Sequence, residues 1–203
     1  MKARTVQRRF VLHVAAVVVV TCALAGCGQS QLPFKSVDIT GAEYAKSFQL
    51  TDHLGQVRQL EDFRGRLVVV FFGFTQCPDV CPTALMELAQ VKTQLGADGD
   101  KVQGIFITVD PQRDTPEVLK AYMALFDPGL LELRGTPEQL AATAKEFKVF
   151  YKKVEGKTPT SYTMEHSAAS FVFDTQGRLR LYVRPGSGPQ LLADDLRLLL
   201  PSS

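Results

Sequence analysis

Two segments of the chain are almost uninterrupted runs of apolar residues. Residues 67–74 read LVVVFFGF, with Gly65 before them and Pro78 after them, and residues 102–109 read VQGIFITV. Runs of this length are typical of strands that are buried on both faces, because helices cover the sheet on either side. We therefore predict two central strands at these positions.

Helical patterns follow each of these runs. Residues 83–95 carry Leu and Val at intervals of three and four, which predicts one amphipathic helix. Two more helices are predicted over residues 115–126 and 136–147, because each segment opens with a Thr-Pro pair that supplies an N-cap and a first-turn proline. In the second of them, Gln139 completes a capping box.

Two hairpins flank this core. Residues 48–60 predict a small hairpin at the domain edge, residues 170–183 predict another around the turn 174–177, and Pro189 opens a last helix rich in Leu. This order of elements predicts an α/β fold. We expect a thioredoxin-like sandwich with a central mixed sheet flanked by helices, an N-terminal hairpin and an inserted loop before the last hairpin.

The N-terminus differs in character from the rest of the chain. Residues 1–26 carry four basic residues and no acidic one, and residues 10–25 are mostly apolar but shorter than the roughly 20 residues that span a bilayer. This arrangement indicates a secretory signal peptide. Residues 24–27 read Leu-Ala-Gly-Cys and resemble the lipobox of bacterial lipoproteins. That resemblance implies cleavage before Cys27 and lipidation of its sulfur.

The expected location is the bacterial cell envelope, as a membrane-anchored lipoprotein with its domain on the extracytoplasmic (periplasmic) side. Residues 27–42 lack periodicity and contain Gly, Ser and Pro, so we expect a tether there. Residues 43–203 are then long enough for one domain. Without residues 1–26, only 19 of the 23 basic residues remain against 21 acidic ones, which argues against nucleic-acid binding.

Cysteine usage directs attention to one place. If Cys22 leaves with the signal peptide and Cys27 carries lipid, Cys77 and Cys81 are the free thiols of the domain. Both lie between the first apolar strand and the first helix, where the helix dipole favours a thiolate. A thiolate is both a nucleophile and a metal ligand. Two of them suit Cu(I), with Zn(II) as the common competitor.

Two histidines of the domain are candidate further ligands. Two cysteines and two histidines are enough for a Cys₂His₂ zinc site. However, His53 lies in a predicted hairpin turn and is expected to be a surface residue. His166 lies on a predicted loop that enters a strand and can reach the sheet edge near Cys77. On its own, a loop histidine is more often structural. Met164, a soft thioether close by, is expected to fill space.

Three motifs carry a family resemblance. Residues 73–82 (GFTQCPDVCP), 108–116 (TVDPQRDTP) and 162–167 (YTMEHS) together resemble the Sco/SenC family. Its members are membrane-tethered copper proteins of the thioredoxin fold that help to build the CuA centre of cytochrome c oxidase. The resemblance covers about residues 43–200.

The resemblance also implies roles for individual residues. Cys77, Cys81 and His166 match the copper ligands of the family, which implies one copper ion per chain, as Cu(I) or Cu(II). Asp110 is a candidate for a position beside the metal site. Asp114 is expected to cap the helix that follows it.

Two functions follow from these residues. The leading hypothesis is a copper metallochaperone that delivers copper to, or prepares, the CuA-bearing subunit of cytochrome c oxidase. The alternative is a thiol–disulfide oxidoreductase that reduces the CuA cysteines, with Cys77 attacking a disulfide and Cys81 resolving the mixed disulfide. The three-residue spacing and His166 favour the chaperone.

Overall fold

A mixed eight-stranded sheet forms the centre of the domain. The computed structural model describes residues 32–158 and 161–201, so the predicted signal peptide and Cys27 lie outside the described residues. Residues from Phe34 onward form one unit. In the part of the chain that is described, no helix has the length and apolar character needed to cross a membrane.

The strand order in this sheet is β1-β10-β9-β4-β5-β6-β2-β3. The pairs β4·β5 and β5·β6 are parallel and the other pairs are antiparallel, which confirms a mixed sheet. Both central strands, β4 and β5, are buried along their whole length, as their apolar runs predict. The strand bounds are β1 Val37–Asp38, β2 Gln49–Asp52, β3 Val57–Gln59, β4 Leu67–Gly73, β5 Val102–Thr108, β6 Leu131–Arg134, β9 Ser170–Phe173 and β10 Leu179–Val183.

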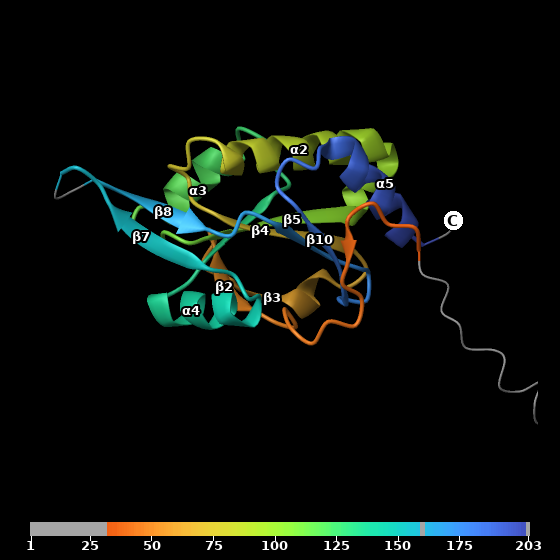
Figure 1. Cartoon of the computed structure of the whole chain (residues 1–203), viewed down its shortest axis with the longest axis horizontal. Helices are drawn as coiled ribbons and strands as arrows, with labels where there is room; N and C mark the ends of the chain where they lie inside the picture. Colours follow the sequence, from red (N-terminus) through yellow and green to blue (C-terminus); the bar gives the residue numbers. More distant parts are fainter. Residues whose placement is uncertain (1–31, 159–160, 202–203) are drawn as a thin grey trace, which may run out of the picture. The chain divides into compact units, whose positions relative to one another are not determined.

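Helices cover both faces of the sheet. Figure 1 shows α2 (Val80–Leu95), α3 (Pro116–Met123) and α5 (Pro189–Leu199) above it, and α4 (Pro137–Glu146) below it. Two short 3₁₀ helices, η1 (Leu60–Phe63) and η2 (Gly96–Lys101), precede the strands β4 and β5. Both predicted Thr N-caps are present, because the hydroxyls of Thr115 and Thr136 accept backbone N–H groups of α3 and α4. The predicted thioredoxin-like α/β class is confirmed.

The insertion before the last hairpin is present, but the prediction that it is a loop is wrong. Its residues form a ribbon of two antiparallel strands, β7 (Tyr151–Glu155) and β8 (Tyr162–His166), which is a separate sheet. In Figure 1 this ribbon extends away from the central sheet. The sequence of β7, YKKVE, is too polar to reveal a strand, and the structure places His166 at the end of β8 rather than on a loop.

The start of the domain is also ordered earlier than the predicted tether suggests. Strand β1 lies within residues 27–42 and pairs with β10. Before it, the backbone N–H groups of Lys35 and Ser36 donate to the fully buried carboxylate of Asp195 in α5, at 2.7 and 2.8 Å. Part of the segment assigned to the tether is therefore folded onto the domain.

Candidate metal centre

The site is built where β4 ends and α2 begins. Cys77 lies in the connecting loop and Cys81 is the second residue of α2, which starts three residues before the predicted position 83. Pro82 is accommodated in the first helical turn, because N–H groups there have no partner within the helix. The N–H of Cys81 lies 3.4 Å from the Cys77 sulfur, so the two residues are in direct contact. Both thiols are free and buried.

A glycine makes room for one of the sulfurs. Gly73 is the last residue of β4, and a Cβ atom placed on it would lie only 2.9 Å from the Sγ atom of Cys81. Real Cβ atoms do not approach other heavy atoms so closely. The Cys81 sulfur therefore rests against the strand end at a point that only glycine leaves open.

His166 reaches the two cysteines from the ribbon. Its Nε2 atom lies 3.5 Å from the Cys81 sulfur, and its Nδ1 atom lies 3.1 Å from the carbonyl oxygen of Ser167. A carbonyl can only accept, so Nδ1 carries the proton and the lone pair of Nε2 faces the sulfur. The imidazole forms T-shaped contacts with the rings of Phe71 and Phe74, with centroid distances of 6.2 and 5.8 Å.

These three residues form one cluster. One ligand atom each from Cys77, Cys81 and His166 lies within 4.8 Å of the other two. Within residues 32–158 and 161–201, this is the one group of three or more His, Cys, Asp or Glu side chains that is close enough to hold a metal ion. The fold thus brings together all three residues that the motifs single out.

Burial controls the protonation of the cluster. It raises the pKa of the Cys81 thiol well above its usual range, and the contact with Cys77 acts in the same direction. The expectation that the helix N-terminus lowers the pKa is therefore wrong for Cys81, because loss of water outweighs the dipole. Burial also lowers the pKa of His166, against a smaller opposing effect of the Ser167 carbonyl. Cys81 and His166 are both neutral at pH 7 before metal binds.

His53 lies elsewhere in the molecule. It stands in the turn between β2 and β3, and its Nδ1 atom is 2.6 Å from a carboxylate oxygen of Glu132, which is buried in β6. It takes no part in the cysteine cluster, so a Cys₂His₂ site is not formed.

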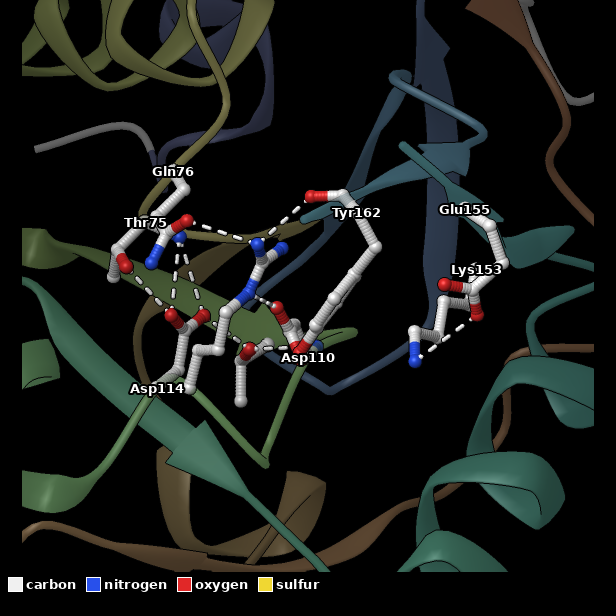
Figure 2. A network of polar contacts seen from close by, with 9 residues as sticks. Thr75, Gln76, Asp110, Asp114, Lys153, Glu155 and Tyr162 are labelled. Atoms are coloured by element: carbon white, nitrogen blue, oxygen red, sulfur yellow. Dashed lines mark hydrogen bonds and ion pairs between the residues drawn. The ribbon is translucent and has the colours of Figure 1, made fainter. Parts of the chain in front are cut away.

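Asp114 has a different role from the predicted helix cap. Thr115 is the N-cap of α3, whereas the Asp114 carboxylate is fully buried. It accepts hydrogen bonds from the N–H of Thr75 at 3.2 Å and from the Thr75 hydroxyl (Figure 2). It also accepts one from the Thr108 hydroxyl. Asp114 therefore ties the loop that holds Cys77 to the end of β5.

Asp110 lies beside the cluster without touching it. Its carboxylate accepts a hydrogen bond from the Tyr162 hydroxyl at 2.8 Å (Figure 2). It also pairs with the guanidinium of Arg113. Neither Arg113 nor Tyr162 was identified as a site residue from the sequence, because neither belongs to a recognised ligand type. Their position in the motifs 108–116 and 162–167 was the available signal. Met164 lies two residues before His166 on the half-buried face of β8.

Known proteins are similar to this chain in sequence and in fold. The model of the SCO1/SenC family matches residues 37–200. The bovine "Protein SCO2 homolog, mitochondrial" is 39% identical over 152 residues, which are 74% of this chain and 57% of the bovine protein. The chain thus aligns with little more than half of that relative's length.

Two solved structures are similar over nearly their whole length. The structure of Bradyrhizobium japonicum ScoI with copper bound is 42% identical, with a TM-score of 0.70, and the match covers 76% of this chain and 98% of that one. The solution structures of apo Sco1 from Thermus thermophilus are 36% identical, with a TM-score of 0.75, and the match covers 85% and 100%. The motifs, the fold and these matches agree, and the chain belongs to the SCO1/SenC family.

Proposed function

We propose that this protein is a copper metallochaperone that binds one copper ion and delivers it to, or prepares, the CuA site of cytochrome c oxidase. The observation that carries the proposal is the convergence of two sulfur atoms and one imidazole nitrogen within 4.8 Å. The copper-bound state of the ScoI relative supports the choice of ion. The oxidase as partner follows from the family resemblance.

The donor set suits a metal that must be handed on. Thiolates are soft ligands that favour Cu(I), whereas structural zinc sites usually use four protein ligands. Among the described residues, no fourth His, Cys, Asp or Glu joins the cluster. An incoming thiolate from an acceptor protein can therefore approach the bound copper and displace the ligands one at a time.

Protons are exchanged when copper arrives. The burial that raises the pKa of Cys81 means that copper must displace its proton. His166 needs no such step, because its neutral form already faces the sulfur through Nε2. The site is thus expected to bind copper and release protons together.

Thiol–disulfide exchange is the second candidate function. The N–H of Cys81 donates to the Cys77 sulfur, and Cys77 is 8% exposed whereas Cys81 is fully buried, so Cys77 is the more accessible of the two sulfurs. Cys77 would then attack a substrate disulfide and release one thiolate. Cys81 would attack the mixed disulfide, which leaves Cys77–Cys81 oxidised and the substrate reduced.

Replacement of His166 by Ala separates the two functions. We expect His166→Ala to weaken copper binding strongly, because one of three ligands is lost, and to leave disulfide reduction by Cys77 and Cys81 nearly unchanged. Copper affinity is measured by competition with a chelator, and reduction is measured on insulin. His53→Ala is the matched control and should bind copper normally, since His53 lies in another part of the domain.

The opposite pattern contradicts the proposal. If His166→Ala binds copper like the wild type but loses exchange activity, the histidine acts as a base for thiol chemistry. The reductase would then be the better assignment.

The proposal includes a place in the cell. We infer that residues 1–26 are removed, that Cys27 carries the lipid anchor, and that a short tether leads to the folded domain on the extracytoplasmic side of the bacterial membrane. The small residues before Cys27 support this assignment. An anchored donor would remain close to a membrane-bound oxidase subunit.

A further inference from the structure

Arg113 connects three segments that surround the cysteine cluster. It lies in the connection between β5 and α3, and its side chain is only 19% exposed. One guanidinium nitrogen, Nη1, donates to the side-chain oxygen of Gln76 and to the main-chain carbonyl of Tyr162, both at 2.9 Å. The Nε atom pairs with Asp110. Gln76 precedes Cys77, and Tyr162 is the first residue of the strand that ends at His166.

Tyr162 is held on more than one side. The guanidinium of Arg113 lies over its ring at 3.6 Å from the centroid, and the ammonium group of Lys153 lies 4.3 Å from the same centroid. Its hydroxyl donates to Asp110 at 2.8 Å. Figure 2 shows the Tyr162 hydroxyl directed at the Asp110 carboxylate. A ring between two cations, with its hydroxyl bonded, has little freedom to move.

The ribbon needs such a connection. Its strands β7 and β8 pair only with each other among the described residues. At its base, Phe150 and Ser167 exchange hydrogen bonds, with the Ser167 N–H donating to the Phe150 carbonyl at 2.9 Å. That pairing lies within the hairpin itself, so it does not fix the ribbon against the loop that carries Cys77. Besides the contacts of His166 itself with Cys81 and Phe74, the contacts of Arg113 with Gln76 and Tyr162 join the ribbon to this loop.

We propose that Arg113 is a positioning residue that holds the β7–β8 ribbon against the Cys77 loop, and so keeps His166 beside the two thiols before copper binds. Asp110 orients the guanidinium of Arg113, and the guanidinium packs on the ring of Tyr162. The expected effect on copper affinity rests on the proposed copper function. The position of the ribbon against the Cys77 loop does not depend on any metal.

The consequence for binding follows from population. Copper binds with full affinity only when His166 lies beside the cysteines. Its apparent affinity is therefore reduced in proportion to the fraction of molecules in which His166 is in that position. Loss of a hydrogen bond to a charged group changes such an equilibrium by about tenfold or more. We therefore expect removal of the Arg113 side chain to weaken copper binding by about tenfold, although Arg113 is no ligand.

The experiment uses the full chain in detergent, with Cys22→Ser and Cys27→Ser so that Cys77 and Cys81 are its only thiols. Amide hydrogen exchange of the reduced, metal-free protein is measured first, and affinity for Cu(I) is measured by chelator competition second. Arg113→Ala should speed exchange in β7 and β8 by about tenfold and leave β4 and β5 unchanged. Arg113→Lys keeps the charge but cannot make the forked contacts, so it should not restore the wild-type values.

Two further variants complete the test. Arg134→Ala is the matched control, because Arg134 donates to the Pro111 carbonyl of the same connection and has no hydrogen bond to the ribbon in the part of the chain described. Tyr162→Phe removes only the hydroxyl bonded to Asp110, and serves if Arg113→Ala folds poorly. It should speed ribbon exchange to a lesser degree.

The outcomes separate this inference from the proposed function. Wild-type exchange in the ribbon of Arg113→Ala overturns the inference whether or not the protein binds copper. Equal effects of Arg134→Ala on the ribbon also overturn it. A wild-type protein that binds no copper overturns the proposed function alone, and faster ribbon exchange in Arg113→Ala would still support the positioning role.

Discussion

Replacing Gly73 by Ala tests whether the packing at the end of β4 sets the position of Cys81. The added methyl group would lie 2.8 Å from a ring carbon of Phe106 and 2.9 Å from the Cys81 sulfur and from a ring carbon of Phe71. Ordinary contacts between such atoms are about 3.5–4.0 Å. The methyl group can be accommodated only if these neighbours shift, and for the sulfur that shift is roughly half an ångström or more.

The cost can be worked from these contacts. Overpacking a core by one methyl group costs about 1–3 kcal/mol, and Gly→Ala returns about 0.4–1 kcal/mol by restricting the unfolded chain. The net loss of about 1–2 kcal/mol should lower the Tm by about 2–8 °C in a domain of this size. The affinity for copper should also fall, by about tenfold or more, because ligand distances in a metal site tolerate only about 0.2 Å.

Gly104→Ala is the matched control for this prediction. A Cβ atom on Gly104 in β5 would crowd Leu130 and would lie 2.7 Å from a methyl carbon of Leu88, with no sulfur nearby. Both variants are compared by thermal unfolding and by Cu(I) competition. We expect both to lower the Tm and only Gly73→Ala to weaken copper binding. A Gly73→Ala protein with wild-type copper affinity, or a Gly104→Ala protein with an equal loss, would refute the reasoning.

Three further predictions concern acid stability, anchoring and oxidation. Burial alone would raise the pKa of Asp174, but hydrogen bonds from Arg178 and its neighbours hold it below the ordinary value of 3.8. Its contribution to stability is therefore present above about pH 4 and lost as the pH falls through the folded pKa. Asp174→Asn should flatten the acid side of a plot of urea midpoint against pH, and an unchanged acid side would contradict this role. Cys27→Ser should release the protein from membranes or leave an unprocessed precursor, as judged by fractionation, and normal processing with retention would disprove lipidation. Oxidation to a Cys77–Cys81 disulfide should abolish copper binding until a reductant is added, and tight binding by the oxidised protein would show that the sulfurs are not both ligands.

The sequence by itself determined the central frame of the fold. The seven-residue strands β4 and β5 and the N-caps of α3 and α4 all lie where the apolar runs and Thr-Pro pairs predict them. These signals are local, because burial on both faces demands a continuous apolar run and a helix start demands a capping side chain. The hairpins β2–β3 and β9–β10 were predictable for the same reason.

Short and polar strands depended on partners far along the chain. Strand β1 has two residues and pairs with β10, and β6 has four residues and pairs with β5 and β2. Strand β7 reads YKKVE and exposes both lysines. The stability of such strands comes from cross-strand neighbours, which no local pattern of this length encodes.

The chemistry of the site divides in the same way. The motif around Cys77 and Cys81 and its place before a helix were legible in the sequence. Only the tertiary structure brought His166, 85 residues beyond Cys81, to 3.5 Å from its sulfur. The tertiary structure also decided that the pKa of Cys81 is raised and that the Asp114 carboxylate is buried. The physical reason is that water exclusion and hydrogen-bond partners depend on what the whole fold packs around a side chain, while spacing reports only its neighbours along the chain.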